Sequence, residues 1–444
     1  MSDPPQFTIV GAGLAGALLA CYLGRTGYRV DLHEKRADPR AQDPERGRSI
    51  NLALSVRGIQ ALREVGLAEQ VLEQAIPMRG RMMHAVSGAL VFMPYGKDDA
   101  ESIHSVSRAG LNISLLQAAA GFPKVRLFFQ HRCTGFDLNS GTLEIQTPGT
   151  ESPQQVSCDI ALGADGSYSA IRAALQRHDR FNYEQSYLSH GYKELTIAAG
   201  AGGAFAMEKH ALHIWPRHSF MMIALPNQGG SFTVTLFLPY DGPSSFAALK
   251  TDDDIQRFFL QQFPDAVALL PELVQQYHAN PVGPLLTVRC QPWHLGGRVA
   301  LIGDACHAVV PFLGQGMNAA FEDCTVLDRC LRHHAPDWEA AFADFERQRK
   351  VHTDALADMA VDNFLEMRDR VSSRWFLWKK KLDILLHRLL PGWYLPLYTL
   401  ITFTTTPYAE ARRRARQQVR YVRLVVGWAG LIVFLLVVFL LVRP

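Results

Sequence analysis

The stretch Phe7-Thr-Ile-Val-Gly-Ala-Gly-Leu-Ala-Gly16 decides the fold of this chain of 444 residues. Its first four residues are typical of a buried strand, and the apolar residues that follow at 14–23 recur with helical spacing. The three glycines between them permit a tight turn and let a pyrophosphate approach the backbone at the positive end of the helix. The stretch therefore predicts the opening unit of a dinucleotide-binding domain.

A second strand is predicted at residues 28–32, and it delivers Glu34. This acid lies about twenty residues beyond the glycine motif, where a carboxylate accepts hydrogen bonds from a ribose. The motif and the acid together indicate a dinucleotide, but they do not say which one.

A distant segment distinguishes between the dinucleotides. Residues 299–302 predict a buried parallel strand that ends in Gly303-Asp304, and Gly314-Gln-Gly-Met-Asn318 follows, with a helix expected from about Gly316. An aspartate at the end of a strand hydrogen-bonds a polyol, and the glycine turn lets backbone N–H groups approach an electron-rich ring. A ribityl chain joined to an isoalloxazine requires both features, so the predicted dinucleotide is FAD.

Composition and charge narrow the class of protein. Hydrophobic residues make up 48% of the chain, which is long enough for two or three domains. The net charge is +3, but residues 411–423 hold six arginines and no acid, and Arg443 adds another. Removing these seven arginines leaves a body of −4, which argues against nucleic acid as a partner.

The cysteines and histidines predict neither disulfides nor a metal site. The seven cysteines are odd in number and include no C-x-x-C pair, and the sixteen histidines show no ligand spacing. The dinucleotide strand begins almost at once, so we expect no signal peptide and a reducing compartment. Cys306, beside the second motif, is interpreted as a small buried residue rather than a redox group.

The predicted fold class is α/β, with a Rossmann-type FAD-binding domain interrupted by an antiparallel substrate domain. The insertion is indicated by strand candidates at residues 211–215, 220–225 and 231–238. A C-terminal helical region and one transmembrane helix follow. The predicted parts are FAD-binding segments 1–77, 105–180 and 285–345, substrate-domain segments 78–104 and 181–284, helical region 346–423, and membrane helix 424–442.

The C-terminal tail predicts membrane attachment. Residues 424–442 form a run of nineteen without a charge, enough for roughly 28 Å of helix, about one hydrocarbon core. The arginines before it favour a cytoplasmic catalytic domain. We expect a tail anchor in a mitochondrial outer membrane if the source is eukaryotic, or an inner membrane if bacterial. The aromatic-rich stretch 375–398 has two interpretations, a contact with the membrane surface or a helical lid over the active site.

Three ordered fingerprints resemble those of class A flavoprotein aromatic hydroxylases. They are the first glycine motif, Asp159-Ile-Ala-Leu-Gly-Ala-Asp-Gly166 with Arg172 after it, and Gly303-Asp304. Within that class, seven further stretches resemble the kynurenine 3-monooxygenase family, from the first strand to the C-terminal region. These stretches are residues 47–55, 76–84, 94–96, 105–108, 213–217, 311–318 and 396–398.

The resemblance implies hydroxylation of L-kynurenine to 3-hydroxy-L-kynurenine in tryptophan degradation. FAD would be reduced by NADPH as co-substrate and would react with O2 through a flavin C4a-hydroperoxide. It implies no catalytic side chain beyond the flavin, and a pocket wall at Pro311 and Phe312. No second glycine motif is present for NADPH.

The resemblance also implies the binding residues. The substrate-binding residues, among which an arginine suits the carboxylate of an α-amino acid, are Arg81, Tyr95, Asn363 and Tyr398. The cofactor-binding residues are Gly11, Gly13, Ala15, Gly16, His33, Glu34, Lys35, Arg36, Ala53, Arg108, Cys133, Asp165, Asp304, Gly316, Met317 and Asn318.

Three other functions stay open at the level of sequence. One is a class A hydroxylase of another aromatic acid, and a second is a membrane flavin reductase that acts on lipid. A third is a flavoprotein kept as a membrane scaffold. The arginine, tyrosine and asparagine set predicted for an amino acid argues against the first two, and the sequence does not specify an oligomeric state.

Overall fold

The structure is a computed structural model that describes residues 5–41, 51–96, 101–369, 383, 385–387, 389–390 and 392–442. Side chains 366–369, 426, 429–430 and 432–442 are not described. Residues 47–50 of the family-like stretches therefore lie outside the described residues, as do the predicted surface residues Trp375 and Trp378.

A six-stranded sheet with the order β18-β19-β12-β1-β2-β8 forms the nucleotide domain. Five strands are parallel, and only β18 runs antiparallel. The glycine motif lies between β1 and α1, at the carboxyl edge of the sheet, which is where ligands bind in such folds. The strands are β1 (Gln6–Val10), β2 (Arg29–Glu34), β8 (Val125–Phe129), β12 (Ile160–Gly163), β18 (His294–Leu295) and β19 (Val299–Leu301).

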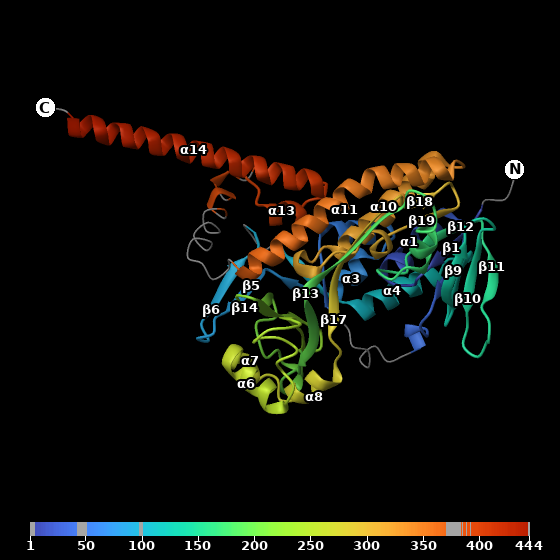
Figure 1. Cartoon of the computed structure of the whole chain (residues 1–444), viewed down its shortest axis with the longest axis horizontal. Coiled ribbons are helices and arrows are strands. Elements are labelled where there is room, and N and C mark those ends of the chain that lie inside the picture. Colours follow the sequence, from blue (N-terminus) through green and yellow to red (C-terminus); the bar gives the residue numbers. More distant parts are fainter. Residues whose placement is uncertain are drawn as a thin grey trace.

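Helices cover this sheet because their apolar faces pack on its buried strands in one core. The first helix, α1, lies against α4 and α10 (Figure 1). These helices are α1 (Leu14–Thr26), α2 (Val56–Glu64), α3 (Ala68–Glu73), α4 (Arg108–Ala120), α5 (Ala170–Leu175), α9 (Asp304–His307), α10 (Gly316–His334) and α11 (Trp338–Asp369).

Two three-stranded sheets complete this part of the molecule. One has the order β3-β7-β4, and the other β11-β10-β9. Their strands are β3 (Asn51–Leu54), β4 (Ile76–Met78), β7 (Ile103–Ser107), β9 (Arg132–Asp137), β10 (Thr142–Gln146) and β11 (Gln154–Ser157). Short turns of 3-10 helix lie at Pro39–Ala41, Ala201–Gly203 and Pro311–Leu313.

A seven-stranded sheet forms the second layer, with the order β17-β13-β16-β15-β14-β5-β6. All neighbours are antiparallel except β5 and β14. Its strands are β5 (Gly80–His84), β6 (Leu90–Pro94), β13 (Asn182–Ile197), β14 (Ala211–Arg217), β15 (Phe220–Pro226), β16 (Phe232–Pro239) and β17 (Gly283–Gln291).

The three strands predicted in this sheet are present, but β13 was not expected. Its first half is mostly exposed, so the sequence lacks the alternation that predicts a strand. It pairs with β17 and runs between the two parts of the molecule (Figure 1). The boundary predicted between residues 284 and 285 falls inside β17, because pairing with β13 keeps that segment in the sheet.

The two faces of this sheet pack on different partners. One face carries residues such as Met222 and Leu236 into a core with α6 (Asp252–Gln262), α7 (Pro264–Val267) and α8 (Leu273–Ala279). The opposite face carries Met221 and Phe237 into a core with α11 and the C-terminal helices. Because side chains alternate along a strand, Arg81 and His84 of β5 point to opposite faces.

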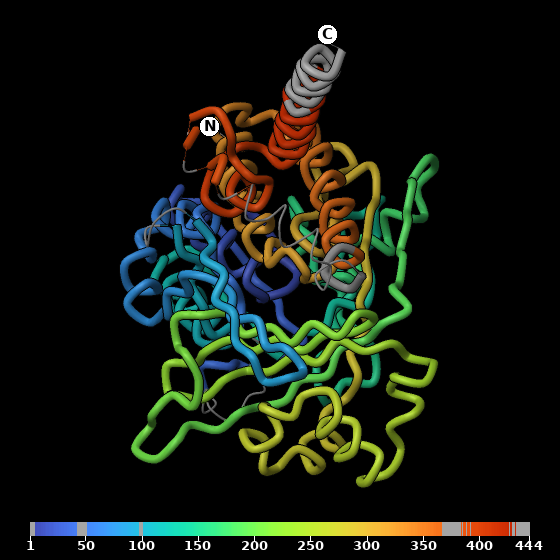
Figure 2. The backbone as a smooth tube through the Cα atoms, turned by 90° about the vertical axis from the view of Figure 1, so that its left-hand side faces the viewer, coloured from blue at the N-terminus to red at the C-terminus, as the bar shows by residue number. Residues whose placement is uncertain are grey.

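The C-terminal region packs against α11. It contains α13 (Leu397–Thr402) and α14 (Tyr408–Val442), which extends away from the body (Figures 1 and 2). Among the residues whose side chains the structure describes, no helix is long and apolar enough to cross a membrane. Most side chains of the predicted span at 424–442 lie outside that description.

A buried histidine pair joins β5 and β14 to α7. His84 Nδ1 lies 2.6 Å from Asp265 Oδ2, and His84 Nε2 lies 2.8 Å from His213 Nδ1. His213 Nε2 donates to the Glu208 carbonyl oxygen at 2.8 Å. Burial lowers the pKa of His213 from its ordinary value near 6.5 to about 4, so this imidazole is neutral in the folded protein.

This neutral histidine predicts a loss of stability in acid. Between the two pKa values the unfolded chain binds a proton that the folded chain excludes, so stability is lost as pH falls from 6.5 toward 4. At about pH 5 the loss is about 2 kcal/mol of unfolding free energy. Thermal unfolding across this pH range measures it. His213→Gln keeps the donor but cannot be protonated, so we expect a shallower pH dependence, and an unchanged one would contradict the assignment.

Candidate active site

The first glycine motif forms a cradle that is crowded by protein atoms at Gly11 and Gly16 and open at Gly13. Gly11 has φ +101°, and a Cβ there would lie 2.5 Å from the Ala164 carbonyl oxygen. A Cβ on Gly16 would lie 1.9 Å from the Gly11 carbonyl oxygen, whereas one on Gly13 would meet no atom within 4 Å. No side chain caps α1 after Gly13. The open space and the free helix end suit a pyrophosphate.

The end of β2 places a carboxylate beside this cradle. Glu34 accepts hydrogen bonds from the Ala12 N–H at 2.9 Å and the Arg36 N–H at 3.0 Å. The residue before it, His33, accepts the Gly11 N–H through its carbonyl oxygen. The backbone N–H groups of Ala12 and Arg36 thus hold the Glu34 carboxylate at the glycine turn. The structure brings these residues together as a dinucleotide site requires.

Four predicted cofactor residues lie near this end of β2. The buried His33 ring stacks on Phe128 with centroids 4.8 Å apart, and Lys35 and Arg36 are exposed. Cys133 donates to the Gly135 carbonyl oxygen at 3.3 Å, and burial raises the pKa of its thiol to about 12. The thiol is therefore unreactive, and its role at the site is limited to packing or backbone contact.

Hydrogen bonds join the second fingerprint, residues 159–166 with Arg172, to the third fingerprint at Gly303-Asp304. Asp165, just after β12, accepts the Ala170 N–H at 2.7 Å through Oδ2, while Oδ1 is buried and unpaired among the described residues. Arg172 donates to the Ser167 carbonyl oxygen at 2.6 Å and the Ala305 carbonyl oxygen at 2.8 Å. The arginine thus joins the loop after β12 to the helix that carries Asp304.

The Gly303-Asp304 turn rests on a carboxylate that the sequence did not single out. Asp323 of α10 accepts the Gly303 N–H at 3.2 Å, His307 Nε2 at 2.5 Å and Arg349 Nε at 2.6 Å. Burial alone would raise the pKa of Asp323, but its contacts with His307 and Arg349 hold it below its usual range. The turn is therefore fixed by a charged network before any ligand binds.

Asp304 itself projects from the end of β19 into the site. Desolvation raises the pKa of its carboxyl, and the electrostatic effects of His307 and Arg108 oppose that rise. Arg108 is exposed at the start of α4, where Ser107 Oγ accepts the Gly110 N–H at 3.1 Å. Arg108 and Asp304, both predicted cofactor residues, thus lie close enough for the guanidinium to lower the pKa of the carboxyl.

Asn318 clamps the second glycine turn to β3. Its amide donates to the carbonyl oxygens of Ala53 and Gly314, both at 2.9 Å, and accepts the Ser55 N–H at 2.9 Å. A Cβ on Gly314 would lie 3.2 Å from the Ala53 Cβ. Three other predicted cofactor residues lie next to this clamp. The Ala15 Cβ lies 3.4 Å from a Cβ built on Gly303. Gly316 is the first residue of α10, and Met317 packs on the core of the nucleotide domain.

Three side chains from distant segments form a cationic aromatic cluster. The Arg81 guanidinium lies 4.6 Å from the Tyr398 ring centroid and 5.4 Å from that of Tyr95. The two rings stack with centroids 5.3 Å apart. Arg81 forms no ion pair with any described residue, its polar neighbours are the two tyrosine hydroxyls, and its Nε is buried without a hydrogen-bond partner among the described residues. Such unpaired polar groups are costly unless a ligand satisfies them.

This cluster adjoins the flavin turn. Tyr95 packs with Ala53 and Phe403 around Met78 and Ile103, and Ala53 is the residue that Asn318 holds. Burial raises the pKa of Tyr95 well above its usual range, so its hydroxyl stays protonated and can donate a hydrogen bond.

Asn363 holds the predicted apolar wall. Its side-chain amide donates to the Phe312 carbonyl oxygen at 2.8 Å. The Phe312 ring stacks on Phe364 at 4.4 Å and lies 5.0 Å from Phe237, while Pro311 is exposed. The bond shows Asn363 as a support of the wall, and the contact with substrate predicted for it stays a prediction.

Sequence reasoning missed two more residues that hold the site. Arg57 forms an ion pair with Glu322 at 2.7 Å, donates to the carbonyl oxygens of Thr405 and Thr406, and stacks on Tyr408 at 4.2 Å. Tyr408 in turn donates to Gln315 Oε1 at 3.0 Å. Polar residues at helical positions carry no local signal for such contacts, so only the fold reveals them.

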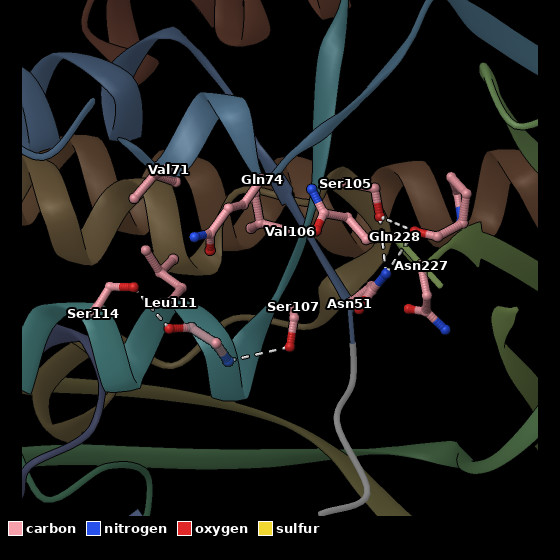
Figure 3. A pocket seen from close by; sticks show the side chains of 12 residues that line it. Asn51, Val71, Gln74, Ser105, Val106, Ser107, Leu111, Ser114, Asn227 and Gln228 are labelled. Carbon is pink, nitrogen blue, oxygen red and sulfur yellow. Dashed lines mark hydrogen bonds between the residues drawn. The ribbon is translucent and has the colours of Figure 1, made fainter. Parts of the chain in front are cut away.

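A separate cavity of about 110 Å³ lies between α3, α4 and the turn after β15 (Figure 3). Its lining is uncharged. Asn51, which belongs to a family-like stretch but was not predicted as a binding residue, donates from Nδ2 to Ser105 Oγ at 3.0 Å and to the Pro226 carbonyl oxygen at 2.7 Å. These bonds tie β3 to the end of β15 and so fix the strand that carries Ala53.

The glycine cradle, the fixed Glu34 carboxylate and the unpaired Asp165 oxygen fit an FAD molecule. The fold and the site define a flavoprotein that binds FAD at the edge of a Rossmann-type sheet. In agreement, a family model described as "FAD binding domain" matches residues 6–358.

Solved structures share the fold. A 2-methyl-3-hydroxypyridine-5-carboxylic acid oxygenase superposes with TM-score 0.68 at 20% identity, covering 86% of this chain and 98% of that one. PqsL of P. aeruginosa, in complex with 2-aminobenzoylacetate, gives 0.66 at 20% identity, covering 83% and 98%. At this identity the likeness concerns the fold alone.

Sequence relatives identify the family within the class. The kynurenine 3-monooxygenase of Myxococcus xanthus is 53% identical over 404 residues, which cover 91% of this chain and 87% of the relative. That of Sus scrofa is 42% identical over 441 residues, covering 99% and 92%. The chain belongs to the kynurenine 3-monooxygenase family, as the sequence motifs predicted.

The cradle predicts the effect of a single side chain at Gly13. The backbone there is extended (φ −70°, ψ −175°) and a Cβ meets no protein atom, so Gly13→Val is compatible with folding but fills the space assigned to the pyrophosphate. We expect FAD affinity to fall at least about tenfold, or about 1.4 kcal/mol, in a titration of apoprotein by flavin fluorescence. Gly229→Val, at an equally open turn, is the control. Equal affinities of the two variants would remove FAD from this cradle.

Proposed function

We propose that this chain hydroxylates L-kynurenine to 3-hydroxy-L-kynurenine, using FAD, NADPH and O2. The observation that carries the proposal is the unpaired Arg81 cation between Tyr95 and Tyr398, next to the flavin turn, in a member of this family. When bound, FAD supplies transfer of a hydride from NADPH to flavin and activation of O2 for insertion of one oxygen atom.

Arg81 is assigned to the carboxylate of the substrate. A guanidinium presents parallel N–H donors that match a carboxylate, and here its Nε already lacks a protein partner. The Tyr95 hydroxyl, protonated and adjacent to the guanidinium, supplies one more donor. Tyr398 stacks on Tyr95 and covers the guanidinium. Together these groups orient an amino acid whose aromatic end points to the flavin turn.

The apolar wall is assigned to keeping water from the reacting atoms. Phe312, Phe364 and Phe237 pack on one another at the turn that precedes the glycines. Asn363 fixes the backbone of this wall. A dry pocket prevents loss of the activated oxygen to water.

No side chain is assigned as a general base or nucleophile. The ring carbon next to the aniline-type amino group of kynurenine is already electron-rich, so attack by an electrophilic oxygen needs no protein base. Cys306, the nearest thiol to the Asp304 motif in sequence, is buried, and this desolvation raises the pKa of its thiol well above its usual range. It stays a neutral packing residue.

The same proposal places the protein on a membrane through residues 424–442. This run carries no charge, and α14 continues as helix through it. The arginines at its start favour a cytosolic catalytic domain, on a mitochondrial outer membrane or a bacterial inner membrane. Retention of the full chain on neutral vesicles through an alkaline carbonate wash tests the anchor.

Removing the Arg81 cation is expected to weaken substrate binding and leave the flavin in place. For Arg81→Ala we expect KM to rise by about 30-fold or more, which corresponds to about 2–4 kcal/mol for a buried charge-assisted pair, with an unchanged flavin spectrum. Steady-state NADPH oxidation against L-kynurenine concentration measures it. Arg79→Ala, two residues away and exposed, is the matched control. An unchanged KM in Arg81→Ala would remove Arg81 from the substrate site.

The activity itself is tested by NADPH oxidation in the detergent-solubilised, FAD-loaded protein with and without L-kynurenine. We expect strong stimulation and a product heavier by one oxygen atom. Stimulation without an oxygenated product would mean that the ligand is recognised but oxygen transfer is uncoupled. No stimulation would contradict L-kynurenine as the substrate and favour another aromatic acid or a lipid.

A further inference from the structure

The cavity between α3, α4 and the turn after β15 is separate from the flavin turn and from the substrate cluster. It has a volume of about 110 Å³, and three of its lining residues, Gln74, Ser107 and Gln228, are exposed, so it opens to solvent. An enclosed apolar cavity of about 150 Å³ holds benzene. This cavity therefore has room for most of a six-membered ring, with the rest of the ligand at the opening.

The lining combines apolar walls with polar groups and carries no charge. Val71, Val106, Leu111 and Pro226 form the apolar walls, and the other side chains of the lining are amides and hydroxyls. An ammonium group or a carboxylate would lose hydration there without meeting a counter-charge, which is costly. The lining thus suits a neutral ligand that has a flat apolar part and a polar group able to form hydrogen bonds.

One buried acceptor in this lining lacks a partner. Asn51 is 6% exposed, and its Nδ2 donates to Ser105 Oγ and to the Pro226 carbonyl oxygen (Figure 3). Because a carbonyl oxygen can only accept, these bonds fix the amide with its nitrogen toward Pro226 and its oxygen turned away. Asn51 Oδ1 has no hydrogen-bond partner among the described residues. A buried acceptor costs free energy unless a donor satisfies it, so an N–H or O–H group of a ligand would stabilise this site.

The cavity shares a strand with the flavin turn. Asn51 and Ala53 lie two residues apart on β3, so their side chains point to the same face of the sheet. The Ala53 Cβ lies 3.2 Å from a Cβ built on Gly314, and the Ala53 carbonyl oxygen accepts from Asn318. A ligand bound at Asn51 would therefore contact the strand that supports the flavin turn.

We propose that this cavity, which we call the Asn51 cavity, binds a neutral aromatic carboxamide, the chemical group of the nicotinamide ring. The carboxamide N–H donates to Asn51 Oδ1, and the ring packs on the apolar walls at Val71 and Leu111. Two sources carry this group, a free carboxamide and NADPH, and only the second rests on the proposed function. The reduced ring of NADPH is neutral and that of NADP⁺ is cationic, so an uncharged lining favours the reduced form.

Binding is measured without turnover in the full-length, FAD-loaded protein, by saturation-transfer NMR titrations with three probes. Nicotinamide is expected to bind. Methyl nicotinate has a similar shape but no N–H donor, and nicotinate is charged, so each is expected to bind at least about tenfold more weakly. Absence of saturation transfer to nicotinamide, or equal affinities for nicotinamide and methyl nicotinate, would overturn the proposal. This comparison needs no substitution in the protein.

A substitution that fills the cavity locates the bound probe. Ser114 lines the cavity from α4, and its hydroxyl donates only to the Gly110 carbonyl oxygen of the same helix, at 3.1 Å. Ser114→Leu is expected to lower nicotinamide affinity at least about tenfold. Gln117→Leu, at an exposed position of the same helix, is the matched control and should bind like the wild-type protein. Retained flavin absorbance shows that each variant is folded. Equal affinities of the two variants would place nicotinamide elsewhere and overturn the proposal.

Competition separates the two sources of the carboxamide. The flavin is reduced beforehand under argon, so that added NADPH is not consumed. If NADPH displaces nicotinamide, NADP⁺ does so more weakly and Ser114→Leu weakens both ligands, the cavity holds the ring of the co-substrate. If nicotinamide and NADPH bind together, a free carboxamide is the ligand. None of these measurements contains L-kynurenine, so failure of the hydroxylation assay would contradict the proposed function and leave the result for the Asn51 cavity unchanged.

Discussion

The buried carboxylate of Asp323 is the constraint on which the rest of the site depends. It holds the Gly303 N–H, His307 and Arg349 at once, and so fixes the flavin turn, α9 and α11 relative to α10. Arg349 also pairs with Glu322, which pairs with Arg57. A buried charge is costly unless fully paired. Removing one member would leave its partners uncompensated, so the network specifies one arrangement of these elements.

From this framework the site is assembled by segments that are distant in the chain. β5 brings Arg81, the end of β6 brings Tyr95, and α13 brings Tyr398, while Asn318 holds β3 against the glycine turn. Asp323 accepts three donors at the flavin turn, whereas the Arg81 guanidinium has aromatic rings as its neighbours and no carboxylate within ion-pair distance among the described residues. A cation without a protein carboxylate is available to the carboxylate of a ligand.

The C-terminal region links this site to the rest of the chain through Tyr408. The first residue of α14 donates to Gln315 in the flavin turn and lies under the Arg57 guanidinium. The same region supplies Tyr398 and Phe403 beside Tyr95. The helix that leads to the uncharged tail thus begins in direct contact with the cofactor turn.

The sequence by itself determined the dinucleotide fold, FAD and the family, because these depend on glycine spacing, strand ends and local motifs that are read in one segment. The family motifs in the sequence also predicted Arg81, Tyr95 and Tyr398 as substrate-binding residues. Only the tertiary structure decided that these three contact one another, and that Asp323, Arg349 and Arg57 hold the turn, because contacts between distant segments leave no local pattern. The same reason hid β13, whose exposed half lacks alternation, and its partner β17. The tertiary structure also shows that Asn363 supports the wall at Phe312 through a hydrogen bond to its backbone.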